Sequence, residues 1–272
     1  MDSLVKSIRT FLFDVLGLLL PGFIALMLGV LPWLIPSHSL SSFQSYVHSL
    51  SGSTPILFLL LLGCYLLGHV IKVWAKYGYR LSFILLEKNL YQKLLCPMAR
   101  WRWIARFLNT ELGGVTRSFF RALLVCQPPS YDSVMEDLRR AVREKWHSRT
   151  GTPFPGQWHP LFKLAQATGA DNHIPNEMST YLAKYNFYRS MAFLFGLNFA
   201  YLAGLWMTFH QLSFSAFAIA FVANFLFWFS FHVKYKRYWT LCGNEALKVM
   251  YYFFFLFPKK PHDLHPEQSP DP

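Results

Sequence analysis

Four long runs of apolar residues, separated by polar segments, dominate the pattern along the chain. They cover Phe11–Ile35, Pro55–Ala75, Phe187–Phe209 and Leu212–His232. A helix of about 20 mostly apolar residues is long enough to cross the hydrocarbon core of a membrane. The pattern therefore predicts four transmembrane helices. Because only His210 and Gln211 separate the last two runs, these should form an antiparallel hairpin.

The segment between the second and third runs, residues 76–186, has a different pattern. Apolar residues recur there at helical spacing among polar and basic ones. The expected helices are Val115–Cys126, Ser130–Ser148 and Leu161–Thr168, with a break at Gly113-Gly114. The sequence thus predicts an all-α, polytopic membrane protein with a helical cytoplasmic domain inserted between the second and third spans.

After the fourth run, Val233–Phe257 should continue as a cytoplasmic helix, with Gly243 as a weak point. The apolar stretch Tyr251–Phe257 is too short to span, so it should pack against the middle domain, another subunit or the membrane surface. Pro258–Pro272 is polar and Pro-rich, which predicts disorder. The expected regions are 1–75, 76–186, 187–232, 233–257 and 258–272.

The basic residues give the spans a direction. The chain has 26 Lys and Arg against 14 Asp and Glu. Two of the 26 precede the first run, 18 lie between Lys72 and Arg189, and six follow the fourth run, while residues 36–54 and the hairpin turn have none. Lys and Arg accumulate on the cytoplasmic side of spans. The alternation predicts a multi-pass protein of a bacterial inner membrane with both termini in the cytoplasm.

Catalytic chemistry is sparse. Only 15% of residues are charged, against about 25% in soluble domains, and no phosphate-binding loop, metal-ligand spacing or paired-carboxylate motif is present. We therefore expect a protein that is not an enzyme and needs no metal or cofactor. Arg140 and His147 match the loose R-x4–6-H signature of HEPN ribonucleases. In a basic helix, however, two ordinary solvated residues are the favoured interpretation.

Small residues recur at every fourth position of the third run. Such spacing lets two membrane helices approach closely, either within the hairpin or between subunits, and both alternatives stay open. The predicted helix-packing residues, including a comparable stripe on the fourth run, are Ala192, Gly196, Ala200, Gly204, Ala216, Ala220 and Asn224.

Asp14, His69, Asn198 and Asn224 are polar residues within or near the runs. An ionisable group inside a bilayer is a functional hypothesis by default. Asp14 and His69, however, lie near the ends of their runs, and no run carries two charged residues on one face. We favour hydrogen bonding between helices for Asn198 and Asn224 over a transport pathway.

The stretch Met98–Leu108 alternates arginines with aromatic residues. This composition suits a helix at the cytoplasmic membrane surface, with rings at headgroup depth and guanidinium groups on phosphates. The alternative is a groove for a nucleotide or nucleic acid. The residues concerned are Arg100, Trp101, Arg102, Trp103 and Arg106.

Three segments carry a loose resemblance: Phe13–Leu26, Lys184–Phe195 and Tyr235–Tyr252. They resemble segments of small bacterial multi-span membrane proteins associated with anti-phage defence or CRISPR accessory functions. The resemblance implies a non-enzymatic effector that perturbs the membrane when a cytoplasmic ligand or partner signals infection.

The leading functional hypothesis is accordingly an oligomeric inner-membrane effector that is triggered through its basic cytoplasmic domain. Its partners would be the lipid bilayer, further copies of the chain, and a cytoplasmic protein or nucleotide ligand. The alternatives are a membrane anchor whose basic domain binds nucleic acid or a protein without forming a pore, and a membrane-tethered ribonuclease.

Overall fold

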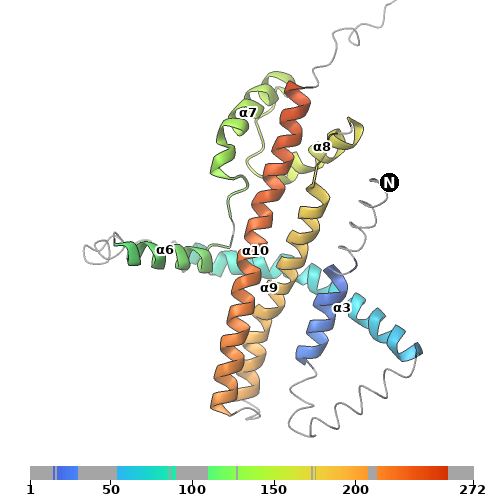
Figure 1. Ribbon diagram of the computed structural model, residues 1–272, viewed down its shortest axis with the longest axis vertical. Helices are drawn as coiled ribbons and strands as arrows, with labels where there is room; N and C mark the ends of the chain where they lie inside the picture. Colours follow the sequence, from blue (N-terminus) through green and yellow to red (C-terminus); the bar gives the residue numbers. More distant parts are fainter. Residues whose placement is uncertain are drawn as a thin grey trace, which may run out of the picture. The chain divides into compact units, whose positions relative to one another are not determined.

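The computed structural model describes residues 15, 17–29, 54–85, 87–89, 110–126, 128–172, 174, 176–207 and 213–256. These residues form helices and no strand. The helices drawn in Figure 1 are α3 (Thr54–Ser82), α6 (Glu111–Leu124), α7 (Glu136–Thr150), α8 (Trp158–Asp171), α9 (Met178–Met207) and α10 (Phe214–Phe255). A shorter apolar helix covers Gly17–Gly29, and residues 83–85 and 87–89 continue α3 in π-helical form.

Three helices are long and apolar enough to cross a membrane: Pro55–Asn89, Met178–Met207 and Phe214–Phe255. They contain the second, third and fourth predicted spans. Of the first predicted span, the structure describes the apolar helix Gly17–Gly29, while most of the rest of Phe11–Ile35 lies outside the described residues. The chain is thus all-helical in its described part, with three candidate spans.

The chain divides into two compact units. The first comprises Met1–Pro128 and Leu182–Tyr238, and the second comprises Pro129–Tyr181 and Trp239–Pro272. Residues 76–128, which the sequence pattern assigned to the cytoplasmic domain, therefore group with the candidate spans. Residues 239–257, expected as a separate helix, group with the middle segment.

Glycine contacts join the helices of the first unit. A Cβ at Gly22 would overlap the backbone carbonyl of Cys64, and a Cβ at Gly68 would overlap the carbonyl of Leu18. The Gly17–Gly29 helix and α3 therefore meet backbone to backbone, as small residues permit in membrane helices. A Cβ at Gly78 would meet the Phe193 ring, so the same helix α3 also packs tightly on α9.

The hairpin predicted from the sequence is formed by α9 and α10. At its centre Asn198 Nδ2 donates to Asn224 Oδ1 at 2.8 Å, and Asn224 Nδ2 donates to the Phe195 carbonyl at 3.0 Å. Stacked rings of Phe195 with Phe227 and Phe231 flank this pair at 5.4 and 5.5 Å between centroids. Both amides are thereby satisfied in an apolar setting, where an unpaired amide would be costly.

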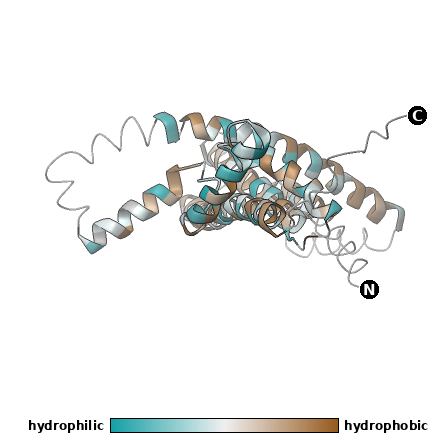
Figure 2. Ribbon diagram, turned by 90° about the horizontal axis from the view of Figure 1, so that it is seen from above, coloured by the Kyte–Doolittle hydropathy of each residue, from teal (hydrophilic) through white to brown (hydrophobic). Residues whose placement is uncertain are grey.

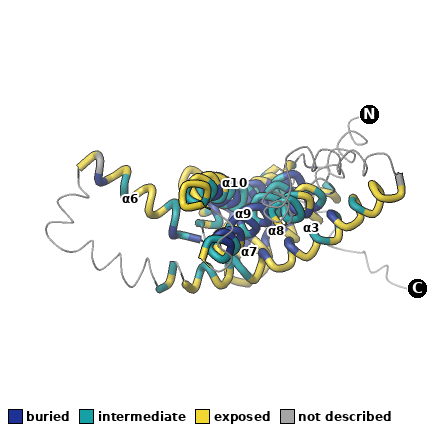
Figure 3. The backbone as a smooth tube through the Cα atoms, turned by 90° about the horizontal axis from the view of Figure 1, so that it is seen from below, coloured by how far each residue is buried: buried dark blue, intermediate teal, exposed yellow. Residues whose placement is uncertain are grey.

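The helices of the first unit differ in how much they bury. In its most apolar 18 residues, α9 has 44% of positions buried, against 17% for α3 and 6% for α10. Figure 3 shows the corresponding exposed surface along α3, and Figure 2 shows that much of this helix is hydrophobic. Helix α9 is therefore the centre of the unit, and α3 and α10 leave apolar faces uncovered, as lipid-facing helices do.

The second unit has a conventional buried core. Trp158 of α8 is 1% exposed and packs edge-on against Trp239 at 5.0 Å and Phe162 at 5.2 Å between centroids. Helix α7 contributes Val142 and Trp146 to the buried set. The other buried residues are Leu161, Ala165, Met178, Cys242, Ala246, Leu247, Val249 and Met250. Burial of this kind is the expected result of folding in water.

Gly243 is a packing contact and not the weak point that the sequence pattern suggested. Helix α10 runs unbroken through it, and a Cβ there would overlap the carbonyl oxygen of Ser130. On the same face, Thr240 Oγ1 donates to the Pro129 carbonyl at 3.0 Å, and Asn244 Oδ1 accepts from the Asp132 amide at 2.9 Å. The absent side chain lets the segment before α7 approach the α10 backbone.

The apolar end of α10 packs within the second unit. The Arg149 guanidinium lies over the rings of Phe253 and Phe254, at 6.0 and 5.3 Å from their centroids, and Phe254 is buried. Of the three destinations expected for this stretch, the middle domain is the one the structure shows. Lys145 lies over Phe255 at 5.8 Å in the same way.

Several helix boundaries differ from the predicted ones. Helix α7 begins at Glu136, after a 3-10 turn at Ser133–Met135, and not at Ser130, and α8 covers Trp158–Asp171 and not Leu161–Thr168. Helix α6 begins at Glu111, because the Thr110 hydroxyl caps it by accepting from the Gly113 amide at 3.1 Å. Gly113-Gly114 therefore lies inside the first turn and is no break. Helix α7 extends to Thr150 and ends at Gly151, whose φ of 64° is the left-handed conformation that glycine adopts readily.

Candidate functional site

A cluster of polar side chains joins α3, α10 and the end of α6 in the first unit. These residues come from distant parts of the sequence, and each contacts at least one other member or the backbone of residues 122–126. We call the set the junction cluster: Tyr79, Glu87, Cys126, His232, Tyr235 and Lys236.

Lys236 and Tyr235 fix the C-terminal end of α6. The Lys236 ammonium donates to the carbonyls of Ala122 and Val125, the latter at 2.9 Å, and the Tyr235 hydroxyl donates to the Cys126 carbonyl at 3.1 Å. The last carbonyls of a helix lack partners within it and carry partial negative charge. A lysine at this position therefore satisfies them both as a donor and as a charge.

Glu87 holds the same segment from the other side. Its carboxylate Oε2 accepts from the Cys126 amide at 2.8 Å. Burial, reinforced by the negative charge of Glu87, raises the pKa of the Cys126 thiol to about 12, and nearby Lys236 offsets only part of the effect. At neutral pH Cys126 is therefore a thiol, which is a poor nucleophile.

The centre of the cluster is the pair Tyr79 and His232. Their hydroxyl and Nδ1 lie 3.1 Å apart, and His232 is 1% exposed. The imidazole also stacks on Trp228 at 5.0 Å between ring centroids. The second ring nitrogen, Nε2, is buried without a hydrogen-bond partner in the described structure. Such a group is costly in a packed interior, so this histidine merits attention as a functional residue.

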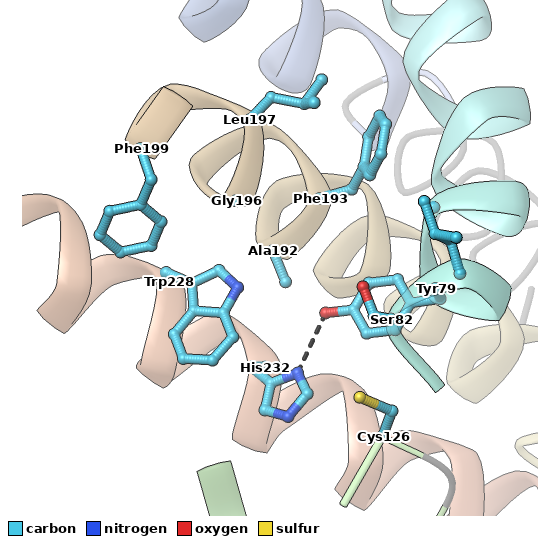
Figure 4. Close-up of a pocket in the computed structure, with 12 residues that line it drawn as sticks. Tyr79, Ser82, Cys126, Ala192, Phe193, Gly196, Leu197, Phe199, Trp228 and His232 are labelled. Carbon is cyan, nitrogen blue, oxygen red and sulfur yellow. Dashed lines mark hydrogen bonds between the residues drawn. The ribbon is translucent and has the colours of Figure 1, made fainter. Parts of the chain in front are cut away.

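A cavity of about 330 Å³ adjoins the pair (Figure 4). One wall comes from α3, a second from α9 and a third from α10, and Cys126 lines the cavity beside His232. Trp228 and Phe199 lie toward one end of the view, and Tyr79 and Ser82 toward the other. The lining residues are Gly78, Tyr79, Leu81, Ser82, Cys126, Ala192, Phe193, Gly196, Leu197, Phe199, Trp228 and His232.

This cavity suits binding or movement better than catalysis. Its volume is at the lower end of ligand pockets, its lining is mainly apolar, and none of its lining residues is Asp, Glu, Lys or Arg. It could hold a small uncharged molecule beside Tyr79 and Ser82. The two small residues Ala192 and Gly196 contribute to its α9 wall.

The predicted small-residue stripe divides into two parts. Ala192 is buried, and Gly196 lies against Trp228, where a Cβ would be 3.6 Å from Nε1. Further along α9, Ala200 is exposed and a Cβ at Gly204 would meet no atom within 4 Å. On α10, Ala216 is exposed and Ala220 half-buried. The hairpin thus occupies only the start of the stripe.

The remaining predicted polar residues do not come together. His69 is exposed on α3 and packs its ring edge-on against Tyr65 at 4.7 Å. Asp14 lies outside the described residues, as does the predicted interfacial set of Arg100, Trp101, Arg102, Trp103 and Arg106. Within the described structure, only Asn198 and Asn224 meet as a pair.

Arg140 and His147 lie on α7 and are both exposed. Neither lines the cavity beside the junction cluster or the smaller one of about 160 Å³ between α9 and the Gly17–Gly29 helix. Nothing in their described surroundings would hold a phosphodiester between them. Helix α7 exposes Arg140, Arg143 and Arg149, and among them the acidic residues Glu136, Asp137 and Glu144.

Sequence reasoning missed the junction cluster, although one signal was present. Glu87 is the only acidic residue between Asp14 and Glu111. An isolated carboxylate in a long apolar and basic region has a specific partner more often than not, since charges there are expensive. The glycines Gly22 and Gly68 gave a similar signal, each lying inside an apolar run.

Comparison of the chain with protein-family models, with curated proteins and with solved structures found no match.

Proposed function

We propose that this protein is an oligomeric membrane effector whose spans respond to an event at its second unit. The observation that carries the proposal is the continuity of α9 and α10. Their 30 and 42 residues correspond to about 45 and 63 Å, while the hydrocarbon core of a membrane is about 30 Å thick. Each helix begins or ends in the second unit and runs without a break into the first.

In this proposal the first unit crosses a bacterial inner membrane with four spans and both termini in the cytoplasm. The charge alternation supports this topology. The length of Pro55–Asn89 supports it as well. Its 35 residues extend about 52 Å, which exceeds the roughly 30 Å thickness of the hydrocarbon core.

Assembly would involve the unfilled part of the small-residue stripe. Ala200 and Gly204 face open space, and α10 buries little of its apolar surface. Small residues on a bare helix face suit close packing of a second helix. The trigger would be a cytoplasmic ligand or protein of an anti-phage defence system, and the response would be a loss of membrane integrity without any catalytic step.

The mechanism would be a change in helix packing, with the cavity as the space that permits it. A ligand shifts such an equilibrium only by its differential affinity for the two arrangements. The junction cluster fixes α6 and α3 to α10 in the described arrangement, so it is the set of contacts that a shift of α10 would break.

The test is membrane potential in cells that express the full chain from an inducible promoter, with and without phage infection. We expect depolarisation on infection with the native chain and its loss in Gly204→Leu. Gly63→Leu is the matched control, because Gly63 also faces open space but lies on α3, and it should respond as the native chain does. Absence of depolarisation in every arm, with the protein present in membranes, would refute the effector proposal.

One observation favours a second candidate, an anchor that binds an anionic partner without forming a pore. It is the pair of exposed arginines, Arg140 and Arg143, on α7. The full chain in lipid nanodiscs would then bind labelled single-stranded RNA with an affinity that falls steeply with salt, and Arg140→Ala with Arg143→Ala would weaken it. Such binding together with an unchanged membrane potential would select the anchor over the effector.

A further inference from the structure

Helix α6 is amphipathic but leaves its apolar face uncovered. Val115 is 67% exposed, and Phe119 and Phe120 are each 42% exposed. Val115 and Phe119 are four residues apart and therefore share a face, while Arg121 lies two positions from Phe119 and points to the opposite side. One face of this helix therefore suits apolar surroundings, while the opposite face, with its cation, suits water or anionic groups.

The contacts of α6 show where along helix α10 it is attached. Phe119 packs on Phe229 of α10 at 5.3 Å between centroids, and Lys236 and Tyr235 hold the last turn and the residues after it. From Phe214 to Val233, α10 contains no Lys or Arg, and Lys234, Lys236 and Arg237 then follow. Helix α6 is thus fixed where α10 changes from apolar to basic.

Residues of α9 indicate the same position along the hairpin independently. Tyr188 stacks on Tyr238 at 5.2 Å between centroids, and the Lys184 ammonium lies over the Tyr238 ring at 5.5 Å. Tyrosines and long basic side chains gather where a membrane helix leaves the hydrocarbon core. Both helices of the hairpin therefore place the membrane–water boundary at the attachment point of α6.

The direction of α6 agrees with its position. In Figures 1 and 3, α6 projects sideways from the α9–α10 hairpin and does not run alongside it. If the hairpin crosses the bilayer with the usual tilt of about 20°, α6 lies close to the membrane plane. Phe119 contacts Phe229, which is on the apolar side of Lys236, so the apolar face of α6 is directed toward the hydrocarbon.

We infer that α6 is an in-plane membrane helix, and that its partner is the cytoplasmic lipid surface. Val115, Phe119 and Phe120 enter the boundary between headgroups and acyl chains, and Arg121 remains at the phosphates or in water. The inference requires that the hairpin spans the membrane. It does not depend on oligomerisation or effector activity, so its failure and that of the proposed function are separable.

The test uses the full chain in vesicles of phosphatidylcholine and phosphatidylglycerol, with a bimane fluorophore on a single exposed cysteine. Cys96→Ser serves as the background, since Cys64, Cys126 and Cys242 are buried. Val115→Cys is the test position. Arg121→Cys is the opposite face of α6, and Val134→Cys, at an 85% exposed valine in the second unit, is the matched control.

We expect brominated lipids to quench the label at position 115 at least about twofold more than at position 134, with position 121 intermediate. Aqueous iodide should give the reverse order. Equal quenching by brominated lipid at 115 and 134 would overturn the inference. So would a label at 115 that neither quencher reaches, because the face would then be covered by protein.

Discussion

The two units differ in how much of their apolar surface they bury. In the second unit, Trp158, Leu161 and Met250 are almost completely buried, and Arg149 and Lys145 cover the aromatic end of α10. In the first unit, α3 and α10 expose large apolar side chains along their lengths, such as Phe58 and Ile219. Burial of apolar side chains is favourable in water, because it removes them from contact with water, whereas lipid provides no such driving force.

Both units nevertheless depend on glycines that allow backbone contact. Gly22 and Gly68 join two apolar helices in the first unit, and Gly243 joins α10 to the segment before α7 in the second. The comparison therefore separates two effects. The solvent decides which side chains are covered, while the close contacts decide which helices are neighbours.

The largest expected effect is from Gly243→Leu. The new side chain would displace the Ser130 carbonyl and separate α10 from residues 129–132, at a cost of at least about 3 kcal/mol. Hydrogen exchange should increase in residues 239–255 and stay unchanged in residues 55–82. Gly156→Leu is the control, since a Cβ there meets nothing within 4 Å. Loss of protection in residues 55–82 as well would contradict this expectation.

Gly22→Leu should act on the first unit alone. It would push the Gly17–Gly29 helix away from α3 and uncover Cys64, which is 2% exposed, at a cost of about 1–3 kcal/mol. The measurement is labelling of Cys64 by N-ethylmaleimide in detergent, in a Cys96→Ser background. Gly63→Leu is the control: Gly63 lies on α3 next to Cys64, but a Cβ there meets nothing within 4 Å, so Cys64 should stay protected. Equal labelling in the two variants would show that Gly22 is no contact.

Substitution of Asn224 and of Asn244 compares a hydrogen bond of the first unit with one of the second. Asn224→Leu leaves Asn198 and the Phe195 carbonyl unpaired in an apolar setting, and should cost about 1–2 kcal/mol. Asn244→Leu removes the partner of the Asp132 amide alone. Asp132 is exposed, so water can replace that partner, and the variant should cost about 0.5–1.5 kcal/mol. Thermal unfolding in detergent measures both. A larger loss for Asn244→Leu would reverse the comparison.

The last comparison of the two units concerns the response to alkaline pH. Burial raises the pKa of Cys126 in the first unit from 9.0, and that of Tyr131 in the second from 10.0, to about 12 in each case. Because the folded pKa exceeds the unfolded one, each group stabilises its unit fully below the unfolded value and loses that contribution as pH rises toward 12. Stability should therefore begin to fall near pH 9 in the first unit and near pH 10 in the second.

Unfolding followed by hydrogen exchange at pH 8 and at pH 11 would measure this difference. Tyr131→Phe should remove part of the pH dependence of the second unit, and Cys126→Ala part of that of the first. An unchanged pH profile in both variants would assign the dependence to other groups.

The sequence predicted the helical class, the α9–α10 hairpin and the helical continuation of α10 beyond the apolar run. It predicted four spans, and three of them coincide with helices long and apolar enough to cross a membrane. These follow from local periodicity and run length, which the chain carries in each segment. It also singled out Asn198 and Asn224, because two amides in apolar runs on neighbouring helices have few other partners.

The sequence did not reveal the junction cluster, the cavity or the role of Gly243. Tyr79, Cys126 and His232 are far apart along the chain, and nothing in their local sequence shows that they meet. A glycine in a helix is equally compatible with a weak point, as expected for Gly243, and with a backbone contact, as the structure has it. Which of the two holds depends on the segment that faces the glycine in the folded chain, and the local sequence does not specify that segment.

What the sequence alone determined, then, is which segments are helical and which are apolar enough for lipid, because both are properties of consecutive residues. The tertiary structure decided which helices touch, that α9 is central while α3 and α10 remain bare, and that Lys236 fixes the end of α6. Those are properties of residues distant in sequence, and they depend on whether particular backbones and side chains can approach one another.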